Sequence, residues 1–156
     1  MRITLITLAL AATPALAEDQ LASVTAVFSI AGECQMLIVS EEERPCKDVI
    51  INTEHDSGRI GFYFIDDSEG GGVITFSGMG LGQRSATENL RLQPVDALIL
   101  KEERVPAVGA CSFENPFVGP ARVQCSAFVE SGELFSGFFL SDGSEPILIF
   151  PEENDG

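Results

Sequence analysis

Tryptophan is absent from the 156-residue sequence, and histidine and tyrosine occur once each, as His55 and Tyr63. Histidine is the side chain that most often performs general acid–base chemistry, and this sequence offers it at one position. Basic residues are also scarce, with 9 Lys and Arg against 24 Asp and Glu, so the formal net charge is −15. Because phosphate recognition depends on clustered Lys and Arg, we expect no nucleic-acid partner.

Motifs for cofactors and metals are missing as well. The glycines from Gly78 to Gly82 have the spacing G-x-G-x-G rather than G-x-G-x-x-G, and the sequence contains no Gly-Lys-Ser or Gly-Lys-Thr. We place them at turns, bulges or close strand crossings. The acidic segments 66–70 and 142–145 lack the spacing of an EF-hand loop, and we interpret them as solvated turns. The sequence therefore predicts neither a cofactor nor a metal.

The segment 54–58, Glu-His-Asp-Ser-Gly, contains the residue types of a catalytic triad. Triad residues usually meet in space from distant parts of the chain, and neighbours in one tight turn cannot adopt that geometry. We therefore expect His55 to be an exposed turn residue and predict that the protein is not an enzyme. Paired carboxylates of a carbohydrate-active enzyme stay an alternative, although 24 acids supply such pairs by chance.

The N-terminus has the three parts of an export signal. Arg2 is followed by the apolar run 3–12 and by the small-x-small pattern Ala15-Leu16-Ala17. The apolar run is too short for a membrane helix, which needs about 20 residues, and we predict no membrane span in the mature chain. Cleavage after residue 17 would leave 156 − 17 = 139 residues. With 8 basic and 24 acidic side chains, the mature chain would have a net charge of 8 − 24 = −16. We expect a protein of the bacterial periplasm or the extracellular space.

Four cysteines lie in the predicted mature region: Cys34, Cys46, Cys111 and Cys125. An even count in an exported protein indicates two disulfides, and neither C-x-x-C nor zinc-ligand spacing is present. Three connectivities are possible. The hairpin pattern favours the local pairs 34–46 and 111–125, each of which would stabilise the fold by about 3 kcal/mol.

The second half of the sequence repeats features of the first in the same order. Such a series indicates an internal duplication, with units at 18–84 and 95–156 joined by a connector at 85–94. In the connector, Ser85 and Glu88 have capping-box spacing, which predicts a short helix limited by Pro94. The matched segments, with offsets of 71, 77, 79, 76 and 74 residues, are 24–27 with 95–98, 32–34 with 109–111, 46 with 125, 61–66 with 137–142, and 73–76 with 147–150.

The matched segments are short, rich in Val, Ile, Phe and Leu, and bounded by Gly, Pro, Asp, Asn and Ser, which is typical of strands. Segments 35–39 and 47–52 flank a tip at 40–45, and we expect them to form a hairpin. The run Phe62-Tyr63-Phe64 is apolar on both faces, as in a strand that lines a barrel or is covered twice. We therefore predict one compact all-β domain of about eight to ten antiparallel strands, either a sandwich or a small barrel.

Two hairpin tips are the candidate binding residues. The first contains Glu41, Glu42 and Glu43, and the second contains Phe117 and Val118 between prolines. A proline-stiffened loop inserts an aromatic side chain into a partner at reduced entropic cost, although Phe117 could instead fold back onto the sheet. We expect a non-enzymatic binding protein whose protein or small-molecule partner is unidentified. The alternative is an anionic inhibitor of a cationic secreted enzyme such as a lysozyme, because opposite charges steer association.

Overall fold

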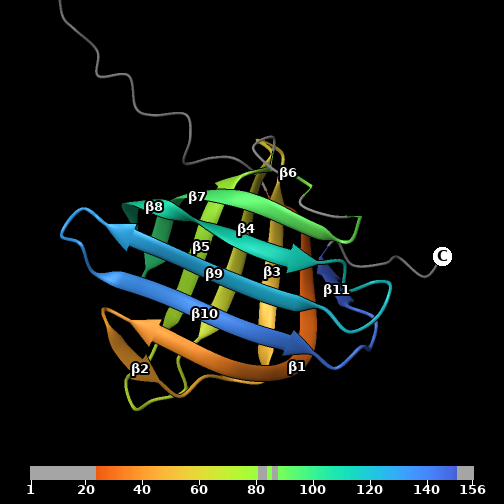
Figure 1. Ribbon diagram of the computed structural model, residues 1–156, viewed down its shortest axis with the longest axis horizontal. Coiled ribbons are helices and arrows are strands. Elements are labelled where there is room, and N and C mark those ends of the chain that lie inside the picture. Colours follow the sequence, from red (N-terminus) through yellow and green to blue (C-terminus); the bar gives the residue numbers. More distant parts are fainter. Residues whose placement is uncertain (1–23, 81–83, 86–87, 151–156) are drawn as a thin grey trace, which may run out of the picture.

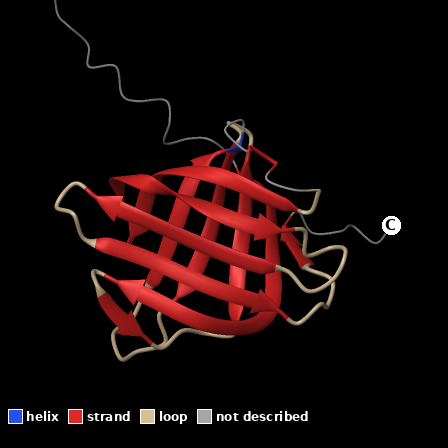
Figure 2. Ribbon diagram, viewed as in Figure 1, coloured by secondary structure: helices blue, strands red, loops and turns tan. Residues whose placement is uncertain are grey.

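The computed structural model describes residues 24–80, 84–85 and 88–150, and within them it contains eleven antiparallel strands and no α-helix. The short blue segment in Figure 2 is a 3₁₀ turn at Gly80. The predicted signal peptide lies outside these residues. The all-β prediction is confirmed. The strands are β1 (Val24–Val39), β2 (Glu42–Arg44), β3 (Val49–His55), β4 (Arg59–Ile65), β5 (Val73–Met79), β6 (Arg84–Ser85), β7 (Leu90–Leu100), β8 (Glu103–Glu114), β9 (Arg122–Val129), β10 (Leu134–Ser141) and β11 (Ile147–Phe150).

Eight of the strands close into a barrel (Figure 1). The sheet runs in the order β10-β9-β8-β7-β5-β4-β3-β1, and β1 also pairs with β10, so the first and last strands of this path meet. The small-barrel form of the prediction is therefore correct. The short strands β2 and β11 pair with β1, and β6 pairs with β7.

The long strand β1 makes the closure possible because its two halves have different neighbours. Residues 24–31 pair with β3, whereas residues 32–38 pair with β10. In Figure 1, β1 descends along the right side of the molecule and then curves along its lower edge. The hairpin expected between 35–39 and 47–52 is therefore wrong: residues 37–39 pair with β2, and β3 pairs with the earlier half of β1.

The barrel interior is filled by side chains, as is usual for eight strands. Gly137 gives space to Phe64, since a Cβ at this glycine would lie 2.6 Å from the phenyl ring. Gly78 has a similar role at a close crossing, where a Cβ would lie 1.9 Å from the carbonyl oxygen of Pro94. The largest fully buried apolar side chains are Phe64, Phe76, Phe139, Leu37, Ile50 and Leu98.

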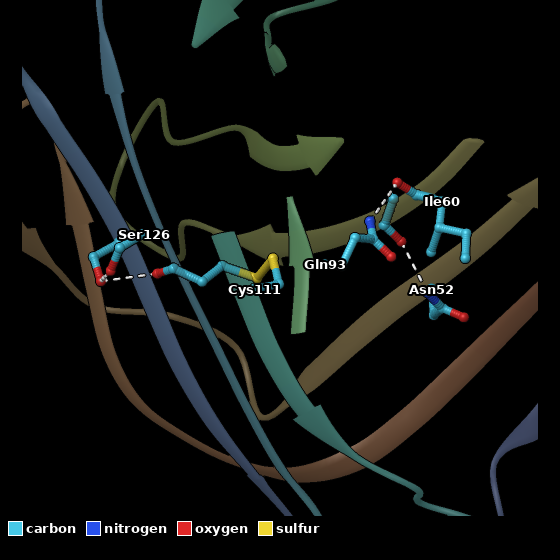
Figure 3. Close-up of a disulfide and its surroundings, with 8 residues drawn as sticks. Asn52, Ile60, Gln93, Cys111 and Ser126 are labelled. Carbon is cyan, nitrogen blue, oxygen red and sulfur yellow. Dashed lines mark hydrogen bonds between the residues drawn. A yellow bond between two sulfur atoms is a disulfide. The ribbon is translucent and has the colours of Figure 1, made fainter. Parts of the chain in front are cut away.

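Both predicted disulfides are present. Cys111 and Cys125 are direct partners in the β8–β9 register, with a Cα–Cα distance of 4.0 Å, and both are fully buried. Figure 3 shows this bridge inside the barrel wall. Cys34 on β1 is joined to Cys46, which follows β2, across a Cα–Cα distance of 5.8 Å.

The connector differs from its prediction. Ser85 pairs with Arg91, and Leu90 already begins β7, so the short helix expected from the capping-box spacing is wrong at both of its ends; residues 86–87 lie outside the described part. Pro94 lies within β7 although it has no backbone N–H to donate. On one side of β7, β5 pairs with residues 97–100 and β6 pairs with residues 91–92. Pro94 falls between these two sets of pairs, so β7 tolerates it.

The internal duplication stays a prediction. Segments 61–66 and 137–142 lie mainly on β4 and β10, and 73–76 and 147–150 lie on β5 and β11. Segments 24–27 and 32–34 share the single strand β1, whereas their counterparts are divided between β7 and β8. No helix within the described ranges is long and apolar enough to cross a membrane.

Candidate site at the mouth of the barrel

One end of the barrel contains a cavity of about 370 Å³, which we call the barrel-mouth cavity. The first half of β1, the end of β3 and the beginning of β4 form one side, and the ends of β7, β8 and β9 nearest the 115–120 loop form the other. The mouths of β-barrels are common places for small-molecule sites, because the strands provide a rigid wall and the loops provide a rim.

The wall of the cavity is mainly apolar and aromatic. Phe28 and Phe117 make an edge-to-face pair with ring centroids 5.6 Å apart, and Phe62 and Phe113 make a tilted pair at 5.1 Å. Such pairs are favourable beyond the area that they bury. The remaining apolar lining residues are Ile30, Ile60, Val123, Pro116, Pro146 and Val118.

Three carboxylates and one guanidinium line the same cavity, those of Glu54, Glu88, Glu114 and Arg91. Glu114 is held by Arg122, whose Nη2 donates to Oε1 at 2.7 Å and whose backbone N–H donates to Oε2 at 2.9 Å. These hydrogen bonds lower the pKa of Glu114 below its ordinary value. Glu114 is therefore an ionised acceptor at neutral pH.

Two side-chain amides donate hydrogen bonds to the backbone of β4 (Figure 3). Asn52 donates through Nδ2 to the carbonyl oxygen of Gly61 at 3.1 Å. Gln93 donates through Nε2 to the carbonyl oxygen of Ile60 at 3.3 Å, and its side chain is fully buried in the barrel. A buried amide is stable only when it is hydrogen-bonded, so the contact of Gln93 in particular favours one arrangement of the cavity wall.

The structure places the predicted tip residues Phe117 and Val118 on the rim of this cavity. The loop is built on Asn115, whose Oδ1 accepts the backbone N–H of Phe117 at 3.0 Å. Phe117 is 52% exposed while its ring contacts Phe28, and Val118 is 72% exposed. Phe117 therefore packs against the barrel through Phe28, as in the folded-back placement, and also exposes about half of its surface to solvent, as in the placement available to a partner.

The acidic tip is at the other end of the barrel. Glu41, Glu42 and Glu43 lie in the β1–β2 hairpin, and the N–H of Glu41 donates to the carbonyl oxygen of Leu134 at 3.0 Å. Glu133 accepts hydrogen bonds from Ser40 and Ser131, which lowers its pKa and joins this hairpin to the β9–β10 turn. The 115–120 loop precedes β9 and the β9–β10 turn follows it, so the two predicted tips cannot form one binding surface (Figure 1).

The other sequence candidates have structural positions. His55 is half-buried as the last residue of β3 rather than exposed in the turn, which corrects our expectation. In the turns at 66–70 and 142–145, Oδ1 of Asp66 and of Asp142 each accept two hydrogen bonds from a serine two residues later, Ser68 and Ser144. The part of the chain that the structure describes contains no cluster of three or more His, Cys, Asp or Glu that could hold a metal.

Most of the cavity was not found by sequence reasoning. Phe28, Asn52, Glu54, Ile60 and Phe113 come from four separate strands, and only the closed barrel brings them together. The sequence signal for these residues would be the set of positions on each strand that face inward near one end of the barrel. That signal needs the register, which a sequence alone leaves open.

Comparison with protein-family models, with curated proteins and with solved structures gave no match to this chain.

Proposed function

We propose that this protein is a non-enzymatic binding protein of the bacterial periplasm or extracellular space, and that it binds a small, largely apolar molecule in the barrel-mouth cavity. The observation that carries the proposal is the cavity itself, about 370 Å³ in volume and lined mainly by apolar side chains. Ligand pockets typically have volumes of about 300–1,000 Å³ and combine an apolar wall with a few polar groups. The two disulfides support an oxidising compartment.

The aromatic rings favour binding over simple core packing. Phe117 is half exposed, although its ring contacts Phe28 at the entrance. A ligand that covers this ring would remove apolar surface from water, at about 25 cal/mol per Å². Each strand of the barrel wall is paired on both sides, and a preformed wall of this kind loses little binding free energy to ordering.

The first prediction tests occupancy of the cavity with a neutral fluorescent probe, N-phenyl-1-naphthylamine, displaced by octan-1-ol. Ile60 is partly buried and lines the cavity, so Ile60→Phe adds volume to the site that the probe must enter. We expect saturable one-to-one binding by the unmodified protein and about a tenfold loss of affinity in Ile60→Phe, equal to about 1.4 kcal/mol.

The matched control is Ile149→Phe, the same substitution at an exposed position on β11. This variant should bind the probe like the unmodified protein, and circular dichroism should show that both variants are folded. Absence of saturable binding, or equal binding by Ile60→Phe and the unmodified protein, would contradict the proposal.

A carbohydrate-active enzyme remains the second candidate because three carboxylates border one cavity. The general acid of a glycosidase has a raised pKa, so that it can donate a proton to the leaving group. Arg122 lowers the pKa of Glu114 instead, and the lining offers many apolar side chains for a polar sugar. Release of nitrophenol from aryl glycosides, abolished by Glu54→Gln or Glu88→Gln, would favour this candidate.

The inhibitor hypothesis uses the opposite end of the barrel. The net charge of −15 would speed association with a cationic enzyme, and Glu41 to Glu43 are exposed in the β1–β2 hairpin. Glu42 already has a partner in Arg44, at 2.5 Å. Binding to a lysozyme at low salt that is lost in a triple glutamate-to-glutamine variant of this tip would support it.

A further inference from the structure

We infer that the ligand of the barrel-mouth cavity is a cationic amphiphile, an apolar chain or ring that carries an alkylammonium head group. This inference rests on the proposed function and adds the charge and polarity of the ligand. It is carried by the arrangement of the lining, in which aromatic rings and carboxylates border the same space.

The side chains that line the cavity have a net negative charge. The lining contains three carboxylates and one guanidinium, which gives 3 − 1 = 2 negative charges. Arg122 neutralises Glu114 from outside the lining, and the excess stays negative when this arginine is counted. Glu54 and Glu88 are exposed at the rim, where a bound head group would also reach water.

The aromatic rings supply the second attraction. Phe28, Phe62, Phe113 and Phe117 all line the cavity, and the faces of phenyl rings attract ammonium groups through their quadrupoles. An alkylammonium group is weakly hydrated when it is substituted, so it can sit against these rings at a smaller desolvation cost than a metal ion. The apolar part would then contact Ile30, Ile60 and Val123 farther in.

The field of the whole molecule acts in the same direction. A formal charge of −15 attracts cations from solution and repels anions, which raises the association rate of a cationic ligand at low ionic strength. Fatty acids and other anionic amphiphiles would be repelled both by this field and by the glutamates at the entrance.

The experiment compares three probes with one octyl tail and different heads: octyltrimethylammonium, octan-1-ol and octyl sulfate. Each displaces N-phenyl-1-naphthylamine from the full mature chain at low salt. We expect octyltrimethylammonium to bind about tenfold more tightly than octan-1-ol, and octyl sulfate to bind most weakly. Added salt should reduce the difference in affinity between octyltrimethylammonium and octan-1-ol, because it screens the attraction between charges.

The test variant is Glu54→Gln/Glu88→Gln, and its control is Glu103→Gln/Glu130→Gln. The control removes the same two charges from exposed acids at the opposite end of the barrel. We expect the test variant to lose most of the preference for the cation while its affinity for octan-1-ol is unchanged, and the control to keep the preference.

The outcomes separate the two proposals. If octan-1-ol binds and the cation binds no more tightly, the inference of a cationic ligand is overturned while the cavity function stands. Tighter binding of octyl sulfate would overturn it as well and would identify Arg91 as the anchor of an anionic head. If none of the three probes binds, both proposals fail.

Discussion

Glu114 links the rim of the cavity to the stability of the barrel. Its carboxylate bonds both the side chain and the backbone N–H of Arg122, so one ion pair joins the end of β8 to the beginning of β9. The side chain of Arg122 is 63% exposed, and solvent therefore weakens the charge interaction. The contact orients the 115–120 loop that it brackets more than it stabilises the fold.

A pH dependence follows from this pair. A carboxyl group whose pKa is lowered by folding stabilises the folded state above its unfolded pKa, and this contribution is lost as the pH falls through the folded pKa. The pKa of Glu114 is lowered from 4.5. We expect Glu114→Gln to lower the free energy of unfolding by about 0.5–1 kcal/mol at pH 7, and by progressively less as the pH falls below the ordinary carboxyl value of 4.5 and through the lowered pKa of Glu114.

Urea unfolding of the two proteins at a series of pH values measures this difference. Glu130→Gln, an exposed acid at the opposite end of β9, serves as the control and should leave the pH profile unchanged. A difference between Glu114→Gln and the unmodified protein that is the same at pH 3 and pH 7 would show that the contact with Arg122 is not electrostatic.

Residue types predicted single positions where the chemistry is local. The disulfide pairs were correct because cysteines near opposed strands have few other partners. For Gly78, the structure selects the close crossing from the three placements that the sequence left open, namely a turn, a bulge or a crossing. His55 was misplaced because β3 extends to it and pairs it with Val24. Whether a turn-forming sequence begins before or after such a residue depends on its distant strand partner.

At the scale of elements, two hairpins have strained turns. The β1–β2 and β7–β8 connections are two-residue loops, and their residues Ser40, Glu41, Lys101 and Glu102 all have φ between 49° and 69°. Positive φ at both positions is the geometry of a type I′ turn, which favours Asn-Gly. Charged residues with a Cβ are less suited to this conformation.

Replacing the second turn with the preferred residues should therefore stabilise the protein. We expect Lys101→Asn/Glu102→Gly to raise the free energy of unfolding by about 0.5–1 kcal/mol, because the left-handed conformation is then reached with less strain. Thermal melting measures the change.

The adjacent substitution Glu103→Gly is the matched control. Glu103 begins β8 and is not among the residues with positive φ, so glycine there only adds flexibility to a strand. This variant should be destabilised by a similar amount. A rise in melting temperature for Glu103→Gly, or a fall for the double variant, would contradict the explanation.

Strands were easier to predict than their pairing. The matched segments, apart from Cys46, lie mainly on strands because their β-branched and aromatic residues suit a pleated wall. The partner of residues 35–39 was wrong because β1 is 16 residues long and changes neighbours at its middle. The expected helix near Ser85 failed because pairing with β7 outweighed a capping signal worth about 1 kcal/mol.

At the scale of the whole molecule, the two disulfides differ in their access to solvent. Cys111 and Cys125 are fully buried within the barrel core, whereas Cys34 and Cys46 are half-buried. A reductant must reach the sulfur atoms, so we expect dithiothreitol to open the 34–46 bridge first under native conditions. Alkylation at intervals, followed by mass spectrometry of the peptides, identifies which cysteines have been released.

The complementary measurement uses two variants. Removing either bridge by paired alanine substitution should lower the free energy of unfolding by about 3 kcal/mol. The 111–125 variant should lose somewhat more, because it also leaves space in the packed core. Release of all four cysteines at one rate would mean that reduction requires global unfolding of the barrel.

Composition and periodicity were enough to predict an all-β fold. They were not enough to decide between a sandwich and a barrel. Closure depends on whether β1 reaches β10, which is a property of strand curvature and stagger. The barrel-mouth cavity exists only after this closure, since it collects side chains from both ends of the sheet path.

The seam between β1 and β10 also has a consequence for the order of events in folding. Gly32 pairs with Ser141, so the first barrel strand must find the last one across most of the described chain. Contacts of such high sequence separation slow folding, because the entropy of a large loop is lost before the contact forms. A chain still leaving a ribosome or a translocation pore could form the successive hairpins from β3 to β9. Until β10 arrives, however, β1 has an open edge that other chains can pair with.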